Sequence, residues 1–372
     1  MAEKADHIWM QRALSLAAKA KGYTAPNPMV GCVIVSKEGE VIGEGYHERA
    51  GKAHAEVNAV EAVSDREKLE GAVVYVTLEP CSHHGKTPPC ADMLAALPLQ
   101  RVVIAMKDPT RKVNGKGIAR LRKAGFEVEV GLLEEEAEKL NEVWLHVLAT
   151  DRPFVTLKIA QTADGYIAAP DGMSKWISCK ESRKRVHRWR AENDAVMVGR
   201  QTAETDNPSL TVRDVEGRQP RRVVIDGPLD LQPHLNLLSD QYEEKTIIIT
   251  YQKEKAAGLG DPMLNLLTPN YFRGETIVVD RRNGHTDLRQ AMKELAKRGI
   301  HSILVEGGQQ LSTALLRQGL ADRLQMFIAP KLLGGGTKSV LGLGLIHMED
   351  VRPFDRYTWT QVGSDMLLTA DL

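Results

Sequence analysis

Three side chains that bind zinc well, His54, Cys81 and Cys90, lie in the first half of the chain. One imidazole and two thiolates leave the fourth position of a tetrahedral zinc ion open to water, which is typical of a catalytic site. Water on such an ion ionises near neutral pH and becomes a nucleophile. Glu56, two residues after His54, is expected to carry protons between that water and a leaving nitrogen without binding the metal. These four residues predict zinc-dependent hydrolytic deamination.

The spacing of the two cysteines separates this chain from the common zinc nucleobase deaminases. Their signature is H-x-E followed by P-C-x-x-C, and the chain has H-A-E at 54–56 and P-C at 80–81. Eight residues, instead of two, separate Cys81 from Cys90. We expect the inserted loop to line a pocket for a larger or charged substrate. It contains Ser82, His83, His84, Gly85 and Lys86.

Two other interpretations stay open at this point. A structural zinc site in a binding module would need a fourth ligand, which His83 or His84 could supply. A nucleoside or tRNA-type zinc deaminase with an appended domain of other function would have the two-residue spacing and, for tRNA, a basic surface. The chain has 49 Lys and Arg against 49 Asp and Glu, so its composition gives no general affinity for nucleic acid or anionic membranes.

The length and composition are those of an ordinary enzyme with two domains. The 372 residues suggest about two domains, and 42% apolar with 26% charged residues is typical of soluble chains. There is no apolar run long enough to span a membrane, and residues 1–22 resemble an amphipathic helix more than a signal peptide. We therefore expect a cytoplasmic protein whose four cysteines are thiols or metal ligands.

Strand-like and helix-like segments alternate along residues 1–147, which predicts a mainly parallel sheet covered on both faces. Strands are expected at 30–35, 40–46, 73–78, 101–106 and 127–130, with 40–46 as the hairpin partner of 30–35, and helices at 1–22, 54–64, 90–96, 117–124 and 134–148. The polar, proline-containing stretch 151–153 follows the last of these helices. It predicts a boundary between one domain at 1–150 and a second at 151–372.

The second half is also predicted to be α/β. Strands are expected at 154–159, 165–168, 195–198, 222–225, 246–250, 276–279, 302–305, 324–329 and 366–368, and helices at 182–192, 287–298 and 311–319. V-E-G-G at 305–308 joins a strand to a helix, where glycines let backbone N–H groups approach an anion. A phosphate-bearing ligand is therefore expected at the start of that helix.

Four motifs of the first half resemble one family closely. They are P-N-P-M-V-G-C at 26–32, G-E-G-Y-H at 43–47, H-A-E at 54–56 and T-L-E-P-C-S-H-H-G-K-T-P-P-C at 77–90. Together they are similar to the deaminase half of the bifunctional riboflavin-biosynthesis deaminase–reductases, whose own cysteine spacing is the longer one. The resemblance implies that His54, Cys81 and Cys90 hold zinc and that Glu56 is the general acid and base. It also implies pyrimidine or phosphoribosyl contacts at Asn27, His47, His83 and Lys86.

Motifs of the second half resemble the reductase half of the same family, a domain similar in fold to dihydrofolate reductase. They are L-K-I-A at 157–160, D-G at 164–165, S-K-W-I-S at 174–178, G-R-Q-T at 199–202, D-N-P-S-L-T-V-R at 206–213, V-I-D-G at 224–227 and G-G-G at 334–336. The implied architecture is α/β with two domains, a cytidine-deaminase-like zinc domain followed by a dihydrofolate-reductase-like domain.

The same resemblance implies the binding residues of the second half. NADPH contacts are implied at Ala160, Trp176, Thr202, Asp206, Gly227, Gly308, Gln309, Gln310, Leu311, Ser312, Thr313 and Ala314. Substrate contacts are implied at Ser174, Arg190, Leu210, Arg213 and Glu306. The residue types agree with these roles, because Arg190 and Arg213 offer planar forks for a phosphate and Glu306 can accept from ribose hydroxyls.

The resemblance implies two consecutive reactions on phosphoribosylaminopyrimidines. The zinc domain would deaminate 2,5-diamino-6-(5-phosphoribosylamino)pyrimidin-4(3H)-one, and the second domain would reduce the ribosyl group of 5-amino-6-(5-phosphoribosylamino)uracil with NADPH. The family is usually oligomeric through the reductase half, so a homo-oligomer is expected. The implied partners are small-molecule substrates, without nucleic acid or membrane.

Overall fold

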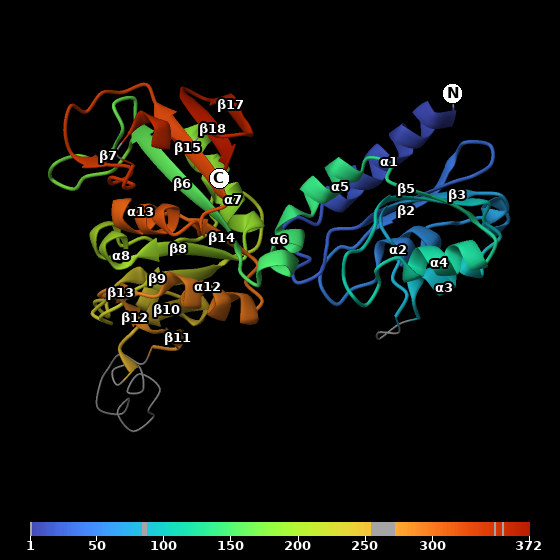
Figure 1. The fold of residues 1–372 in the computed structure, drawn as a ribbon, viewed down its shortest axis with the longest axis horizontal. Helices are drawn as coiled ribbons and strands as arrows, with labels where there is room; N and C mark the ends of the chain where they lie inside the picture. The colour runs from blue at the N-terminus through green and yellow to red at the C-terminus, as the bar shows by residue number, and fades with distance from the viewer. Residues whose placement is uncertain (1, 84–87, 254–271, 346, 352) are drawn as a thin grey trace. The chain divides into compact units, whose positions relative to one another are not determined.

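The chain divides between Thr150 and Asp151 into two units, each with its own sheet and core. The structure is a computed structural model that describes residues 2–83, 88–253, 272–345, 347–351 and 353–372. Figure 1 shows the first unit in blue to green and the second in green to red. Within the described residues, no helix is long and apolar enough to cross a membrane.

The first unit contains a mixed five-stranded sheet, in which the predicted hairpin of 30–35 with 40–46 is confirmed and the predicted parallel pairing holds for the strands at 73–78, 101–106 and 127–130. Its order is β2 (Val41–Tyr46), β1 (Gly31–Val35), β3 (Val73–Leu78), β4 (Arg101–Met106) and β5 (Glu127–Val130). β1 pairs antiparallel with both β2 and β3, whereas β3, β4 and β5 are parallel. The short β1–β2 connection allows only an antiparallel pair, since a parallel pair needs a long crossover.

Helices cover both faces of this sheet. α1 (Ala2–Ala18) and α5 (Glu134–Leu140) pack on one face, and α2 (Ala55–Glu61), α3 (Cys90–Ala95) and α4 (Lys116–Lys123) pack on the other. The helix predicted at 134–148 is two helices, α5 and α6 (Glu142–Thr150). The break falls at Asn141, whose buried side chain binds the backbone N–H and C=O of Met29. An Asx side chain bonded to distant backbone competes with a continuous helix.

The second unit is built on a nine-stranded sheet. Its order is β11 (Glu275–Val278), β10 (Thr246–Thr250), β9 (Arg221–Ile225), β8 (Ala195–Gly199), β14 (Ser302–Val305), β6 (Phe154–Thr162), β15 (Arg323–Ala329), β18 (Asp365–Asp371) and β17 (Tyr357–Val362). Neighbours from β11 through β15 are parallel, and β18 and β17 close the sheet as antiparallel strands. The carboxyl ends of seven strands therefore meet at one edge, where open α/β sheets bind ligands.

Helices again cover both faces of the larger sheet. α12 (Leu288–Lys297) and α13 (Gln309–Arg317) pack on one face, and α7 (Lys180–Glu192), α8 (Arg200–Asp206) and α9 (Asn236–Ser239) pack on the other. Two small two-stranded sheets complete the unit, β7 (Tyr166–Ala168) with β16 (Thr337–Lys338) and β12 (Arg281–Arg282) with β13 (His285–Thr286). This arrangement brings the loops after β6, β8, β9 and β14 to the same end of the sheet.

A substitution of Leu157 in β6 can test the core of the second unit, because the Leu157 side chain has no exposed surface. We expect Leu157→Ala to lower the free energy of unfolding of this unit by about 2–5 kcal/mol through loss of apolar burial and a remaining cavity. Urea denaturation followed by circular dichroism measures the change. Leu343→Ala, at a side chain that is 40% exposed, is the control and is expected to stay within about 0.5 kcal/mol of the parent. A loss at Leu157 as small as that of the control would contradict this core.

Candidate functional site

Three predicted zinc ligands meet at one end of the first sheet. His54 precedes α2, Cys81 follows β3, and Cys90 opens α3. The Nδ1 atom of His54 lies 3.6 Å from the Sγ of Cys81 and 3.3 Å from the Sγ of Cys90. Zinc–nitrogen and zinc–sulfur bonds at a tetrahedral angle place such atoms about 3.6 Å apart. The donor set and its spacing therefore fit a zinc ion.

The group contains three ligands, not four, among the residues that the structure describes. His83, one of the two candidates for a fourth ligand, is not part of it. His84 and Lys86, which the sequence also singled out, lie outside the described residues. Three ligands are the number found in catalytic zinc sites, where the remaining position takes water or substrate.

A buried carboxylate fixes the loop that carries Cys81. Glu79 accepts hydrogen bonds from four backbone N–H groups at 2.9 to 3.3 Å. The donors are Asp108, Gly115, Gly117 and Ile118, at and before the start of α4. A Cβ at Gly117 would lie 2.1 Å from the carbonyl oxygen of Pro80, so this close approach requires glycine. α4 and the Pro80–Cys81 turn are thereby held together.

The electrostatics of the site favour a thiolate and a proton carrier. A hydrogen bond from the Cys90 thiol, with a further one from His54, lowers the pKa of Cys81 to about 4. The backbone N–H of Cys90 donates to the same sulfur at 3.3 Å. Glu56 is 4% exposed, and burial raises the pKa of its carboxyl to about 7. A carboxyl with a pKa near neutrality can both accept and donate a proton at working pH.

Asn27 and His47, two implied substrate contacts, lie together beside His54. The His47 ring is 5.8 Å from the His54 ring in an edge-to-face arrangement. Its Nδ1 is 3.0 Å from the carbonyl oxygen of Ala53, which makes that nitrogen the donor and leaves Nε2 to accept from the Asn27 amide at 3.2 Å. Burial lowers the pKa of His47, in agreement with a neutral ring. These two residues form a polar wall next to the metal ligands.

The second unit has a cavity of about 1950 Å³ at the carboxyl ends of its parallel strands. All predicted binding residues of this unit except Ser312 line it. They are Ala160, Ser174, Trp176, Arg190, Thr202, Asp206, Leu210, Arg213, Gly227, Glu306, Gly308, Gln309, Gln310, Leu311, Thr313 and Ala314. The structure thus gathers segments that are far apart in the sequence around one space large enough for two ligands.

The start of α13 forms one wall of the cavity and suits a nucleotide phosphate. Gly308 is the N-cap residue, and no side chain caps the helix there. A Cβ at Gly308 would lie 3.0 Å from the Thr202 hydroxyl, so glycine keeps this corner open. Free N–H groups at a helix N-terminus bind anions. Ser312 is buried and does not line the cavity, since a helix turns 100° per residue and cannot present seven consecutive side chains to one side.

Arg190 is placed differently from the expectation of a phosphate-binding fork. Its Nε and Nη2 donate to both oxygens of Glu306 at 2.6 and 2.9 Å, and its Nη1 donates to the carbonyl oxygen of Thr211 at 2.9 Å. These bonds use three of the five guanidinium N–H groups inside the protein, and Arg190 also lines the cavity. Burial alone would raise the pKa of Glu306, but Arg190 outweighs it and keeps the pKa below its ordinary value. Arg213, which is exposed at the cavity, remains available for a phosphate.

Trp176 offers an aromatic face at the mouth of the cavity. Its side chain is 65% exposed, and the Arg183 guanidinium lies 4.4 Å from the ring centroid. The ammonium of Lys331 donates to the carbonyl oxygens of Trp176 and Ile177, both at 2.8 Å. The exposed indole is thus held by its backbone and by one cation.

Sequence analysis did not single out His187, which also lines the cavity. Its Nδ1 accepts from the backbone N–H of Arg213 at 3.3 Å, and burial lowers its pKa. Its position three residues before Arg190 on the same helix was the available signal, because such residues share a helix face. Lys158 lines the cavity as well, and burial lowers the pKa of its ammonium.

Comparisons with known proteins agree with both sites. A family model described as the cytidine and deoxycytidylate deaminase zinc-binding region matches residues 3–106, and one described as the RibD C-terminal domain matches residues 153–368. The riboflavin biosynthesis protein RibD of Aquifex aeolicus is 42% identical over 370 residues, which cover 99% of each chain. A solved RibD structure from Acinetobacter baumannii is 34% identical with a TM-score of 0.86, and covers 100% of this chain and 99% of that chain.

The description of a second solved structure names both activities. This structure comes from Thermotoga maritima and is described as a diaminohydroxyphosphoribosylaminopyrimidine deaminase/5-amino-6-(5-phosphoribosylamino)uracil reductase. It is 35% identical to this chain, with a TM-score of 0.87 and full coverage of both chains. The deaminase match falls before Thr150 and the reductase match after Asp151, as the two units do. The chain therefore belongs to the RibD family, the bifunctional deaminase–reductases of riboflavin biosynthesis.

Proposed function

We propose that this chain catalyses two consecutive steps with two separate sites. The first unit deaminates 2,5-diamino-6-(5-phosphoribosylamino)pyrimidin-4(3H)-one, and the second reduces the ribosyl group of 5-amino-6-(5-phosphoribosylamino)uracil to ribityl. The main support for this proposal is that the first unit holds a His–Cys–Cys group, and the second unit has a cavity lined by the N-terminus of a helix without a side-chain cap. The eight-residue spacing of Cys81 and Cys90 favours this function over a nucleoside or tRNA-type deaminase.

In the deamination step, Glu56 is the residue that moves protons. A zinc ion held by His54, Cys81 and Cys90 would supply water that ionises near neutral pH. Glu56 takes a proton from this water as its oxygen bonds to the ring carbon, and passes the proton to the 2-amino nitrogen, which leaves as ammonia when the carbon–nitrogen bond breaks. Asn27 and His47 are suited to bind the pyrimidine, because the His47 ring lies beside the metal ligand His54 and Asn27 contacts His47.

In the reduction step, the residues of the second unit orient two ligands. NADPH bound in this cavity would supply the hydride that C1′ of the ribosyl group accepts. The N–H groups at the start of α13 are suited to its phosphates, and Trp176 to a ring face. Arg213 is suited to the substrate phosphate, and Glu306 to its sugar hydroxyls. Lys158, whose ammonium has a lowered pKa, is suited to donate the proton that accompanies the hydride.

The decisive experiment follows NADPH oxidation by the purified protein with either substrate, before and after zinc removal. Zinc-loaded protein is expected to oxidise NADPH with the diamino substrate, and zinc-stripped protein is expected to do so only with the deaminated substrate. This result is expected because only the first unit carries the metal ligands. Oxidation of the diamino substrate without zinc would contradict the order of steps, and no oxidation with either substrate would contradict the reductase.

Glu56→Gln removes the proton carrier and nearly preserves the shape of the side chain. We expect deamination to slow by about 10²–10⁴-fold, the usual contribution of general acid–base catalysis. Ammonia release measures deamination, and NADPH oxidation with the deaminated substrate is expected to stay at the parental rate. Glu61→Gln, on the exposed face of the same helix, is the matched control. Unchanged ammonia release by the Glu56 variant would rule out this role.

We also propose that the protein is a cytoplasmic homo-oligomer joined through the reductase unit. β17 lies at the edge of the nine-stranded sheet, and Tyr357 and Trp359 are 58% and 50% exposed on it. An exposed edge strand with aromatic side chains is a surface for pairing. Light scattering is expected to give a multiple of the monomer mass, and Trp359→Glu is expected to shift it towards the monomer. Tyr23→Glu, in the first unit, is the control. A monomeric parent protein would refute this assembly.

A further inference from the structure

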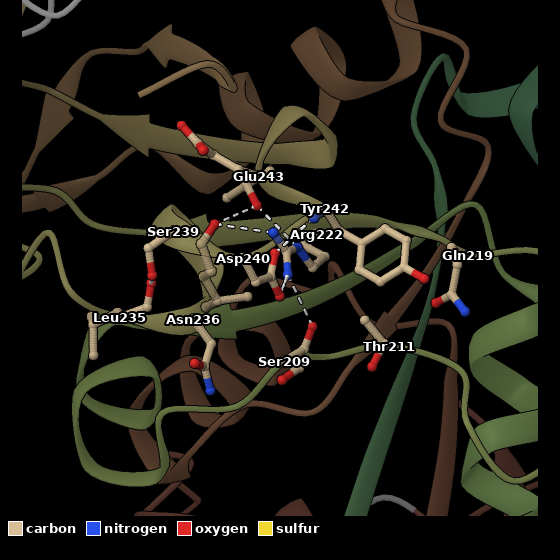
Figure 2. A network of polar contacts seen from close by, with 12 residues as sticks. Ser209, Thr211, Gln219, Arg222, Leu235, Asn236, Ser239, Asp240, Tyr242 and Glu243 are labelled. Atoms are coloured by element: carbon tan, nitrogen blue, oxygen red, sulfur yellow. Dashed lines mark hydrogen bonds and ion pairs between the residues drawn. The ribbon is translucent and has the colours of Figure 1, made fainter. Parts of the chain in front are cut away.

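Arg222 in β9 is a charged residue at an unusual place, since it is 1% exposed and is among the largest fully buried side chains of the described residues. A guanidinium without solvent is tolerated only where its donors are satisfied. Figure 2 shows the polar network in which Arg222 lies. Nε donates to the Thr246 hydroxyl at 3.0 Å, and Nη2 to the Leu237 carbonyl oxygen at 3.1 Å. Nη1 donates to Asp240 at 2.6 Å and to the Ser209 carbonyl oxygen at 3.2 Å.

These four acceptors belong to three segments, and only Ser209 among them lines the cavity. Thr246 begins β10, and Leu237 and Asp240 lie in and after α9. Ser209 lies in the segment 206–213, which contributes Leu210 and Arg213 to the cavity lining. Arg222 therefore ties the wall of the reductase cavity to the body of the sheet.

The hydrogen bond from Arg222 to the Ser209 carbonyl oxygen affects the backbone conformation of the next residue, Leu210. It belongs to the peptide that precedes Leu210, and Leu210 has a φ of +51°, a left-handed value that residues with a Cβ rarely adopt. A hydrogen bond that holds this peptide plane restricts rotation about the N–Cα bond of Leu210, which is its φ angle. The Leu210 side chain is buried in a cluster with Leu237 and Val224. Asn207, also left-handed at φ +40°, is held by the backbone N–H and side-chain amide of Asn236.

A second arginine holds the same loop two residues further on. Arg190 donates to the Thr211 carbonyl oxygen and, with its other donors, to Glu306. Arg222 thus holds the carbonyl of Ser209, the residue before Leu210, and Arg190 holds the carbonyl of Thr211, the residue after it. We propose that Arg222 is a positioning residue of the reductase, which fixes loop 207–213 so that Leu210 and Arg213 meet the substrate. The inference rests on the proposed reductase function, because it names a determinant of that site.

The test compares Arg222→Lys with Thr246→Val. Lysine keeps the charge beside Asp240 but cannot reach the Ser209 and Leu237 carbonyls together. Thr246→Val removes one partner of Arg222 and leaves its bond to Ser209. We expect Arg222→Lys to raise the KM for the deaminated substrate about tenfold, the scale of one hydrogen bond from a charged group. The KM for NADPH and the deamination rate are expected to stay within about twofold of the parent.

The control separates positioning from loss of stability. Thr246→Val is expected to lower the thermal midpoint while leaving both KM values unchanged. If it raises the substrate KM as much as Arg222→Lys does, the effect comes from destabilisation and the inference is wrong. Arg222→Gln, which keeps a single amide donor, is made in parallel and is expected to raise the same KM at least as much.

Amide hydrogen exchange of the ligand-free protein tests the loop without any turnover. Faster exchange at 209–213 is expected in Arg222→Lys and Arg222→Gln, with parental exchange in Thr246→Val. If the parent shows no reductase activity but the variants show faster exchange, the proposed function fails while the positioning stands. If the parent reduces its substrate and both Arg222 variants keep parental KM and exchange, the positioning inference fails while the function stands.

Discussion

The reductase cavity depends on a buried ion pair between Arg190 and Glu306. Two charges removed from water must meet with good geometry, because either one alone would be strongly destabilising. That requirement fixes three elements at once, namely the last turn of α7, the residue after β14 and the backbone at Thr211. The pair shapes the site, and Arg213, which also lines the cavity, keeps access to solvent.

In both units, a buried charged side chain binds several backbone groups of a loop, and the charge is negative in the first unit and positive in the second. In the first, the Glu79 carboxylate gathers backbone N–H groups around the turn that carries Cys81. In the second, the guanidinium of Arg222 gathers carbonyl oxygens around the loop that carries Leu210. Such charge-assisted bonds to backbone are stronger than neutral ones. Each site therefore has a loop whose shape is held by a buried charge instead of by regular secondary structure.

The sequence predicted most strands and the residues that line the sites. It did not predict features that depend on contacts between residues far apart in the chain. β3, β4, β10 and β14 were predicted at their observed bounds, since buried apolar runs signal strands by themselves, and the alternating E-V-E-V of β5 was also predicted at its bounds. β17 was missed because its edge position needs no apolar pattern, and α8 because Ala203 is its one apolar residue. The helix break at Asn141, the antiparallel pairing of β1 with β3 and the partner of Arg190 depend on residues far away along the chain. Motifs placed the metal ligands together, but only the fold shows which groups Arg190 and Arg222 hold.

The join between the units has a consequence for the flow of material through the two reactions. Residues 151–153 connect α6 to β6 within one chain, so both units are synthesised together in a one-to-one ratio. A change in the expression of this chain therefore changes the amounts of both units together. With equal numbers of the two sites, the relative rates of the two reactions determine how much deaminated intermediate accumulates. A substitution that slows the second site cannot be offset by making more of that site, because each added copy also brings another copy of the first.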